Sequence, residues 1–482
     1  MHKIYNPILE GFYPDPAVIT VGNYYYMVNS TFVYFPCLTI SRSKDLQNWE
    51  IVGHAVTEST YIDMSVYDPG RGFWAPDISY TNGRYYITAT LRGNDGDALE
   101  HRQMIVWSEK PEGPYSKPVF IDEPGIDPSL FHDDDGKHYM LLNPSVKIIP
   151  LTEDCLHQAG PARLLYEGWN KRKTEGPHML KKDGYYYLFM AEGGTGDGHM
   201  ITVARAKSLD DEFEPCPHNP LLTQTDKSAV LQRTGHGMPF QSPEGDWFIA
   251  YLCSRKRGGN YSLLGRETSL ATLSWDKDGW PVINEGRGAL TELEIPGSYP
   301  APMKKSESKT FDLTRPLTPD FLSSNGFLLA RQLYIDNVTT LTLHPDKAGN
   351  KEFGLMYHYD INSYIKFAVT NRDGKTELSV KVMNRTKSNE EMLMGISGIE
   401  KVPSDLTLKI NTRGLTKEFI YIKDGVETAV CVIKDCSFLT DEGLSMGKRF
   451  TGPTYGLFGF EENRLAFKEL THQRSQPLRS DL

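Results

Sequence analysis

The sequence predicts an all-β protein in which a five-bladed β-propeller is followed by a β-sandwich. A hairpin pattern recurs five times in the amino-terminal part, the chain holds 26 Tyr and 21 Phe, and apolar residues seldom recur at a helical period. With 482 residues the chain is also longer than one ordinary domain. Two all-β domains are therefore expected.

Each repeat joins an apolar run to a tight turn and then to aromatic residues, which is typical of the first two strands of a small antiparallel sheet. The five segments are PDPAVITVGNYYY from Pro14, PDISYTNGRYY from Pro76, DPSLFHDDDGKHY from Asp127, EGPHMLKKDGYYY from Glu175 and GHGMPFQSPEGDWF from Gly235. Their turn glycines suit a positive φ and are Gly22, Gly83, Gly136, Gly184 and Gly245. The phase markers Asp15, Asp77, Asp127, Glu175 and His236 are 62, 50, 48 and 61 residues apart. Such steps suit a four-stranded blade with its loops.

Four of these five markers are acidic, and equivalent positions of successive blades converge on a propeller axis. Carboxylates crowded together are costly, unless a site must keep one protonated and another ionised at the same pH. Glycoside hydrolysis has that requirement. For a single acid beside a proline or a DG turn, loop capping is the better interpretation. For three or more acids in phase, a catalytic role is the better interpretation.

Composition and charge limit the partners and the cellular location that can be expected. The formal charge is −10, and the basic residues form only short runs, at Lys171 to Lys173 and Arg255 to Arg257, so no nucleic-acid partner is expected. The six cysteines are dispersed and are expected to be reduced and structural. The start, MHKIYNPILEGF, lacks a signal-peptide pattern, and no apolar run reaches membrane-spanning length. A cytoplasmic protein with no membrane partner is the expectation, although a signal peptide removed beforehand would leave no trace.

The predicted domain boundaries follow a change in amino-acid composition along the chain. Residues 1–296 form the propeller, whose last blade is completed near Leu290 by LGRETSLATLSWDKDGWPVI. Residues 297–309 form a linker rich in Pro, Ser and Lys, and residues 310–482 form the sandwich, with turns at Asp373-Gly374 and Asp424-Gly425. A buttress is favoured as the role of the sandwich; a binding module and a wall of the pocket are the alternatives.

Nine motifs now stand in a recognisable order: NPILEGFYPDP, STFVYFP, SRSKDLQNW, GFWAPD, IDPSLFHDDDG, TEGPHML, AEGGT, TGHG and LGRET. In this order the chain resembles glycoside hydrolase family 43, in its β-xylosidase and α-L-arabinofuranosidase branch. The later segment FTGPTYGLF resembles the carboxyl-terminal concanavalin-like, jelly-roll sandwich of that branch. GHGMPF departs from the family's commoner GHA, which puts the sugar preference in doubt.

The resemblance implies an inverting exo-hydrolase with three acids. Asp15 matches the general base, Glu175 the general acid, and Asp127 the acid that orients Glu175 and modulates its pKa. Inversion requires about 6.5 to 9.5 Å between base and acid, to admit a water. An ionised Asp127 beside Glu175 would raise the pKa of Glu175 by like-charge repulsion. Asp77 has the same spacing in the repeat as these acids, but the resemblance implies no catalytic role for it.

The resemblance also implies a substrate-binding set: Phe32, Trp74, His236, Arg266 and Phe450. For the aromatic residues the alternative is packing within a blade or within the sandwich, and for Arg266 it is an ion pair with an acid such as Glu267. His236 could instead lie beside a central water or a bound calcium ion. No metal and no other cofactor is expected to be required.

The expected reaction is release of xylose from the non-reducing end of β-1,4-xylooligosaccharides. The alternatives are an α-L-arabinofuranosidase, an enzyme with both activities, and, in another class, a non-catalytic carbohydrate-binding propeller. The expected partner is a xylooligosaccharide or an oligosaccharide derived from arabinoxylan. A homo-oligomer is suggested by the resemblance alone.

Overall fold

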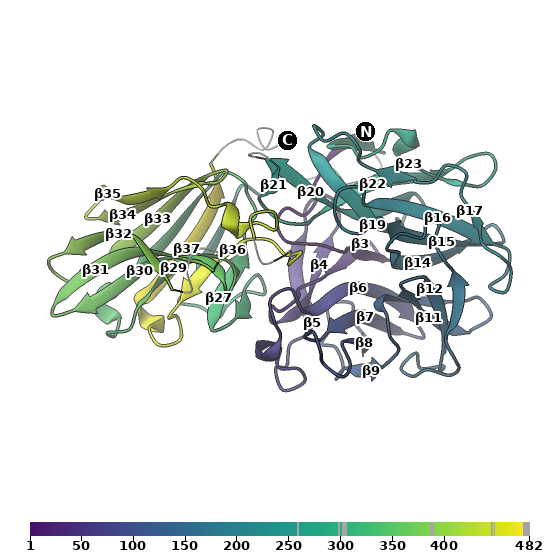
Figure 1. The fold of residues 1–482 in the computed structure, drawn as a ribbon, viewed down its shortest axis with the longest axis horizontal. Helices are drawn as coiled ribbons and strands as arrows, with labels where there is room; N and C mark the ends of the chain where they lie inside the picture. The colour runs from purple at the N-terminus through teal and green to yellow at the C-terminus, as the bar shows by residue number, and fades with distance from the viewer. Residues whose placement is uncertain are drawn as a thin grey trace. The chain divides into compact units, whose positions relative to one another are not determined.

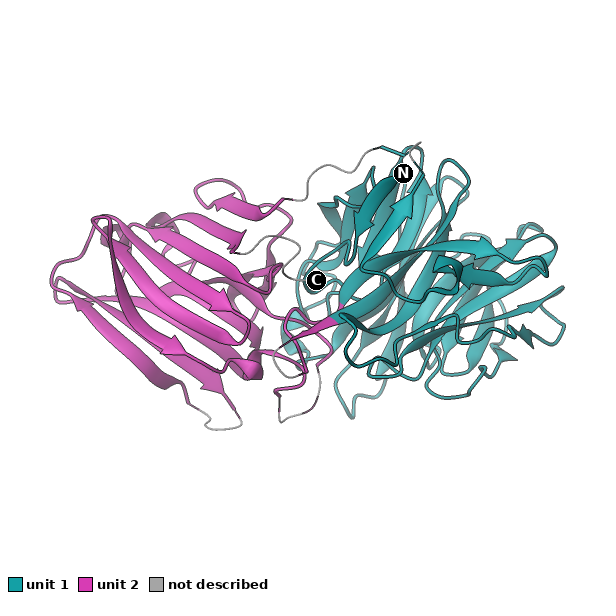
Figure 2. Ribbon diagram, turned by 90° about the horizontal axis from the view of Figure 1, so that it is seen from above, with its two compact units in different colours: residues 1–254, 267–303 teal, residues 255–266, 304–482 magenta. Residues whose placement is uncertain are grey.

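A computed structural model describes residues 1–257, 260–296, 299–300, 306–385, 390–444, 447 and 449–475. It divides into two compact units, residues 1–254 with 267–303 and residues 255–266 with 304–482 (Figure 2). In these ranges the regular structure is β-strand, apart from five 3₁₀ turns: η1 (Met64–Val66), η2 (Asn284–Gly286), η3 (Pro345–Lys347), η4 (Ser437–Leu439) and η5 (Arg464–Ala466). None of the described helices is long and apolar enough to cross a membrane. The all-β prediction is confirmed.

The first unit contains five antiparallel sheets that follow one another along the chain, as a five-bladed propeller requires (Figure 1). Blade 1 is β2 (Ala17–Val21), β3 (Tyr24–Asn29), β4 (Cys37–Ser43) and β5 (Glu50–Val56). Blade 2 is β6 (Gly72–Thr81), β7 (Arg84–Arg92), β8 (His101–Ser108) and β9 (Val119–Ile121). Blade 3 is β10 (Ile126–His132), β11 (His138–Asn143), β12 (Val146–Leu151) and β13 (Arg163–Tyr166).

Blades 4 and 5 carry an extra short strand each. Blade 4 is β14 (Glu175–Lys182), β15 (Tyr185–Glu192), β16 (Met200–Ala206) and β17 (Glu214–Pro215), with β18 (Leu222–Thr223) also on β16. Blade 5 is β19 (Leu231–Gln241), β20 (Trp247–Arg257), β22 (Glu267–Trp275) and β23 (Pro281–Ile283), and β21 (Tyr261–Ser262) pairs with the end of β20. The predicted strands around the DG turn at Asp278-Gly279 are therefore β22 and β23.

The hairpins form where the sequence places their turns. All five turn glycines have a positive φ, between 56° and 93°. Apolar side chains of neighbouring blades then form shared clusters, for example Ile40 of β4 with Ile87 of β7, both fully buried. Each such side chain stabilises the fold by about 1.5–3 kcal/mol. The five blades are thus held by side-chain packing between sheets.

A pairing that the sequence analysis missed joins the two ends of the first unit. β1 (His2–Tyr5) pairs with β24 (Glu292–Ile295), so the chain start is bound to the segment after blade 5. Asn6 extends this link: its amide donates to the carbonyl groups of Leu270 and Leu290 at 2.8 Å each. Its side-chain oxygen accepts from the Leu270 N–H at 2.8 Å.

Apart from Gly72 and Arg233, every blade has one residue at positive φ within its first strand or, in blade 1, just before it. These positive-φ positions are Asp15 (53°), Ala75 (35°), Asp127 (58°), Gly176 (50°) and His236 (48°). In blades 2, 3 and 4 the strand pairing shifts register around them, as a β-bulge does. A side chain at positive φ costs on the order of 1–3 kcal/mol, and such strain is concentrated at functional sites.

The positive-φ positions correct the phase counted from sequence. Asp77 lies two residues after Ala75, and Glu175 lies one residue before Gly176. An inter-blade hydrogen bond supports the corrected phase: Leu130 N–H donates to Asp77 at 2.9 Å, as Val18 N–H donates to the Met238 sulfur at 3.2 Å. In both pairs the donor lies three residues after the positive-φ position of its own blade, and the acceptor lies two residues after that of its blade. The prediction that Asp77 shares the phase of Asp15 and Asp127 is wrong.

The second unit has two antiparallel sheets. The six-stranded sheet has the order β25 (Ser308–Asp312), β37 (Phe467–Arg474), β28 (Asn337–Leu343), β33 (Leu406–Arg413), β34 (Thr416–Lys423), β35 (Val426–Ile433). The seven-stranded sheet has the order β26 (Leu322–Ser324), β27 (Phe327–Arg331), β36 (Thr454–Phe458), β29 (Phe353–Asp360), β30 (Ser363–Arg372), β31 (Lys375–Asn384), β32 (Met392–Ile399). Side chains of both sheets share one buried apolar cluster, which makes the unit a sandwich. The turn residues Asp373, Gly374, Asp424 and Gly425 all have positive φ, as their sequence predicts.

The predicted linker, residues 297–309, is described only in part. Residues 297–298 and 301–305 lie outside the described residues. Tyr299 is buried in the first unit, where its hydroxyl donates to Asp246 at 2.7 Å, and Ser308 already begins β25. The division between the two units falls between residues 303 and 304, within the predicted linker.

Candidate active site

Asp15 is held by blades 1 and 2 together. Its side chain is 4 % exposed, and its Oδ2 accepts a hydrogen bond from the Ser30 hydroxyl at 2.7 Å. The Ser30 oxygen accepts in turn from the Ala75 N–H at 2.7 Å. The other carboxylate oxygen, Oδ1, lies 3.8 Å from Nδ1 of His236. Ser30 thus fixes one oxygen of Asp15 and leaves the other turned toward blade 5.

Asp127 occupies the equivalent position of blade 3. Its N–H donates to the Thr90 hydroxyl at 2.9 Å, and its Oδ2 accepts from the Gly176 N–H at 2.9 Å. The side chain is 7 % exposed. A backbone N–H favours the ionised form of the carboxylate that accepts it. The contacts therefore orient Asp127 and favour its charge.

Glu175 is the first residue of β14 and is partly exposed. Its carboxylate, the carboxylate of Asp127 and a ring nitrogen of His236 all lie within 4.8 Å of one another. The close approach depends on Gly176, because a Cβ there would lie 2.9 Å from the His236 ring. Gly176 therefore admits the imidazole beside the two acids.

His236 contacts groups from three other blades. Its Nδ1 lies 3.8 Å from Oδ1 of Asp15 of blade 1, and one of its ring nitrogens lies within 4.8 Å of the carboxylates of Asp127 and Glu175 of blades 3 and 4. It is 4 % exposed. The structure thus brings Asp15, Asp127, Glu175 and His236, which are far apart in sequence, into one cluster, hereafter the acid cluster.

Asp77 does not belong to the acid cluster. Its Oδ2 accepts from the Leu130 N–H at 2.9 Å, and its Oδ1 lies 3.5 Å from Nδ1 of His178. Neither of these two partners is a carboxylate. Asp77 is a structural acid that joins blade 2 to blades 3 and 4.

Phe32 and Trp74 form an aromatic pair next to the Ser30 contact. Their ring centroids are 6.0 Å apart, and the Phe32 N–H donates to the carbonyl of Phe73 at 3.0 Å. Phe32 is 2 % exposed, whereas Trp74 is only partly buried. Trp74 directly precedes Ala75, whose N–H binds Ser30. Trp74 is thus the more exposed residue of the two.

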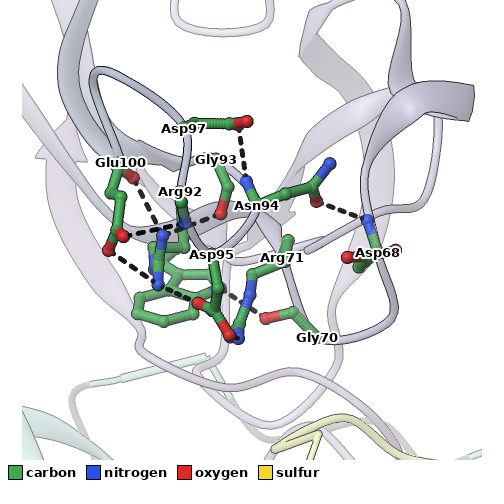
Figure 3. A network of polar contacts seen from close by, with 11 residues as sticks. Asp68, Gly70, Arg71, Arg92, Gly93, Asn94, Asp95, Asp97 and Glu100 are labelled. Atoms are coloured by element: carbon green, nitrogen blue, oxygen red, sulfur yellow. Dashed lines mark hydrogen bonds and ion pairs between the residues drawn. The ribbon is translucent and has the colours of Figure 1, made fainter.

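A polar network that the sequence analysis missed supports Trp74 (Figure 3). The Trp74 Nε1–H donates to the Gly70 carbonyl at 3.1 Å, and the Arg92 guanidinium lies 6.0 Å from the indole centroid. Arg92 pairs with Asp95 at 2.5 Å and Glu100 at 3.1 Å, and Asp95 also binds Arg71 at 2.8 Å. Since Arg92 is 7 % exposed, this network orders the loop beside Trp74.

Arg266 and Phe450 lie together in the second unit, 184 residues apart in sequence. The Arg266 Nε–H donates to the Phe450 carbonyl at 3.0 Å, and its guanidinium lies 5.9 Å from the phenyl centroid. Phe450 has a φ of 60°, and its N–H donates to Asp441 at 2.9 Å. Both predicted ligand residues are thus held by defined contacts and form a pair.

Other contributors carried no predicted role, although Ser30 and Gly176 lie within the motifs STFVYFP and TEGPHML. Ser30, Thr90 and Gly176 act through a hydroxyl or a backbone N–H, which any loop serine, threonine or glycine offers. Only Gly176, just before a proline in EGPH, hinted at a special backbone conformation.

The acid cluster offers two kinds of chemistry. Two carboxylates and an imidazole within 4.8 Å can bind a divalent cation. The same groups also provide a fixed carboxylate, Asp127, beside a more exposed one, Glu175, and a third acid, Asp15, lies 3.8 Å from His236. That second arrangement suits general acid–base catalysis, in which one carboxyl donates a proton while another activates water.

Comparison with known proteins identifies the family and the fold. Residues 4–281 match the family described as glycosyl hydrolases family 43, and residues 314–466 match the beta xylosidase C-terminal concanavalin A-like domain. A xylan 1,3-beta-xylosidase from a Vibrio species is 32 % identical, over 94 % of this chain and 95 % of the relative. Xylosidase/arabinosidase 43B of Humicola insolens is 28 % identical, over 97 % and 96 %. The crystal structure of a xylan beta-1,4-xylosidase from Bacillus halodurans C-125 has a TM-score of 0.87 and 28 % identity, over 98 % of this chain and 100 % of that one.

Proposed function

The chain belongs to glycosyl hydrolase family 43, and from that premise we propose an inverting exo-β-xylosidase that releases xylose from the non-reducing end of β-1,4-xylooligosaccharides. The observation that carries the proposal is the acid cluster, in which Asp127 and Glu175 approach each other beside His236. A propeller that only bound a neutral sugar would need hydrogen-bond partners but no pair of facing carboxyls.

Asp15 is the general base of the proposed reaction. Its Oδ2 is occupied by Ser30, so Oδ1 is the oxygen that would take the proton from the attacking water. This oxygen lies 3.8 Å from Nδ1 of His236, whose ring also lies near the two other acids. In an inverting mechanism the water attacks the anomeric carbon from the face opposite to the leaving group.

Glu175 is the general acid and donates its proton to the leaving glycosidic oxygen. It is the most exposed member of the acid cluster, as a group that must reach a substrate oxygen should be. Asp127 keeps its charge through the Gly176 N–H, and this nearby charge favours the protonated form of Glu175. His236, within reach of both sides, would donate to a sugar hydroxyl between base and acid.

The substrate class is supported by the relatives. A xylan 1,3-beta-xylosidase, a xylan beta-1,4-xylosidase and a xylosidase/arabinosidase all match this chain over nearly its whole length. Terminal xylose is therefore proposed as the sugar in the cluster, with α-L-arabinofuranose as the second candidate. The roles predicted for Phe32, Trp74, Arg266 and Phe450 in lining the sugar site, and the homo-oligomer, stay predictions.

Two assays test the proposal. 4-Nitrophenyl β-D-xylopyranoside is expected to be cleaved faster than the α-L-arabinofuranoside, and β-1,4-xylobiose faster than β-1,3-xylobiose. A preference for the arabinoside would overturn the sugar assignment and leave the acid–base roles intact. Proton NMR during hydrolysis is expected to show α-xylose first. Initial β-xylose would show retention and overturn the inverting mechanism.

A further inference from the structure

Blade 3 holds a second cluster of ligand-type side chains, outside the acid cluster. One ring nitrogen of His132, one of His138 and the sulfur of Cys155 all lie within 4.8 Å of one another. Imidazole and thiolate are the side chains that Zn²⁺ prefers. His138 and Cys155 are buried, at 5 % and 0 % exposure, and His132 is partly buried.

The two histidines are already arranged as a ligand pair. His132 ends β10 and His138 begins β11, where they are direct cross-strand partners. Their Nδ1 atoms are 3.0 Å apart. Two nitrogen ligands of a tetrahedral zinc, each at about 2.0–2.1 Å, are about 3.3 Å apart. Little movement would convert the present hydrogen bond into coordination of one ion.

An outer contact is compatible with the tautomer of His132 that coordination through Nδ1 requires. Its Nε2 lies 3.0 Å from the Ser79 hydroxyl, on the neighbouring blade 2. When Nε2 carries the proton and donates to Ser79, the Nδ1 lone pair faces His138 and the sulfur. Histidine ligands of metals almost always donate their other ring N–H to such a partner.

Cys155 approaches from a different element. It lies in the turn after β12 with a φ of 61°, and its N–H donates to the Thr152 carbonyl at 2.8 Å. The positive φ turns a buried thiol toward the histidine pair. On coordination the thiol gives up its proton to solvent, and the proton on the imidazole Nδ1 that bridges the pair is also lost or moves to Nε2.

A surface cavity lies beside the segment that leads into Cys155. It has a volume of about 520 Å³ and is lined by Asn82, Arg84, Tyr86, Thr152, Glu153 and Asp154. The last three directly precede Cys155, and the Tyr86 ring lies 6.3 Å from that of His132. Glu153 and Asp154 would attract a cation, while the Arg84 guanidinium is held over the Trp107 ring at 3.9 Å. A water from this cavity would complete a tetrahedral site.

We propose that His132, His138 and Cys155 bind one zinc ion, which joins the β10–β11 hairpin to the loop after β12. The ion stabilises blade 3 and takes no part in catalysis. Asp127 lies five residues before His132 on the same strand, which corresponds to about 17 Å. Zinc therefore supports the strand that carries Asp127 without contacting the acid cluster.

The first test is direct metal binding by the full chain. The purified protein is stripped with a chelator and titrated with Co²⁺, which reports a thiolate ligand through a sulfur-to-cobalt charge-transfer band. About one Co²⁺ per chain with that band is expected, and Zn²⁺ should displace it. Carboxylate and imidazole ligands of the acid cluster give no such band, so Co²⁺ bound without it would overturn the proposal.

Variants assign the ligands. Cys155→Ala is expected to abolish the band, whereas Cys37→Ala, which removes another fully buried thiol on blade 1, is expected to keep it. His132→Ala, at the more exposed ligand, is expected to weaken Zn²⁺ binding at least tenfold and serves if Cys155→Ala fails to fold. Retention of the band in Cys155→Ala, or unchanged affinity in His132→Ala, would overturn the assignment.

A third measurement separates stabilisation from catalysis. Zn²⁺ is expected to raise the Tm of the chelator-treated wild type and to leave that of His132→Ala unchanged. Chelation is expected to leave kcat unchanged at a temperature well below unfolding. A Tm that does not respond to Zn²⁺ would contradict a structural ion, and a kcat lost on chelation and restored by metal would place the ion in the acid cluster.

Discussion

The propeller and the sandwich both bury ionisable side chains, and burial has different consequences in the two. In the propeller, Asp15 and Asp127 are at most 7 % exposed and lie with Glu175 in one cluster. In the sandwich, burial lowers the pKa of His358 to about 3, and burial, aided by nearby cations, does the same to His472. Acids are gathered in one cluster of the first unit, whereas burial keeps these two histidines of the second unit neutral.

The surroundings explain the difference. His472 is stacked between the rings of Tyr334 and Tyr455, with centroids 5.2 and 4.2 Å away. In this setting it is neutral. The acids of the propeller instead receive hydrogen-bond donors on one side and face one another on the other. Burial alone therefore does not mark a functional site; facing carboxyls with fixed donors do.

The largest expected effect is that of removing the acid. Glu175→Gln is expected to lower kcat on xylobiose by about 10²–10⁴-fold, because the amide cannot protonate the leaving oxygen. Xylose binding and Tm should change little. Glu212→Gln, an exposed substitution also in blade 4, is the matched control. Unchanged turnover in Glu175→Gln would remove Glu175 from the acid role.

Asp127→Asn tests whether the facing carboxyls act on each other. We expect kcat to fall by about 10²-fold with a smaller change in KM, since the amide oxygen can still accept from Gly176. Loss of the Asp127 charge lowers the pKa of Glu175, so the alkaline limb of the kcat/KM profile should move to lower pH. An alkaline limb that stays in place would show that Asp127 only orients.

Gly176→Ala tests the backbone that brings the cluster together. Its Cβ would lie 2.9 Å from the His236 ring, so the ring must move and kcat should fall by about tenfold. Gly184→Ala is the matched control, because Gly184 also has a positive φ, 78°, but no atom lies within 4 Å of its added Cβ. Equal kcat in the two variants would contradict the role of Gly176.

Asp77→Asn tests whether Asp77 has a structural role, in contrast to the acids of the acid cluster. The substitution removes the charge that faces His178 and is expected to cost about 1–3 kcal/mol of unfolding free energy. Because Asp77 is outside the acid cluster, kcat should stay within a few-fold of wild type. Urea unfolding and xylobiose turnover measure the two quantities. A loss of kcat equal to that of Asp127→Asn would return Asp77 to the catalytic set.

The smallest expected effect is the pH response of the sandwich. His358 and His472 have pKa values of about 3 when folded and an ordinary value of 6.5, so the unfolded chain binds more protons between these pH values. Stability is therefore full above pH 6.5 and falls as pH drops toward 3. His472→Gln should make the decline of unfolding free energy between pH 6.5 and 4.5 shallower. An equally steep decline would contradict a neutral His472.

The hairpins and many of the strands of this protein could be predicted from local sequence. The turn glycines and aromatic runs predicted five hairpins, and the DG turns predicted sandwich strands, because a tight turn with a positive φ depends only on the residues that form it. The recurrence of acids near the strand starts predicted a cluster. Asp15, Asp127 and Glu175 were singled out on that basis together with the family resemblance.

Tertiary structure decided the rest. Counting residues placed Asp77 in phase with Asp127, but bulges at the positive-φ positions move it two residues away, and packing between blades determines those bulges. Of the supports of the cluster, Thr90 and Gly176 belong to other blades than Asp127, which they bind, and Ser30 joins Asp15 of its own blade to Ala75 of blade 2. Contacts between distant segments depend on the relative positions of whole sheets, and a linear pattern of turns and strands does not contain that information.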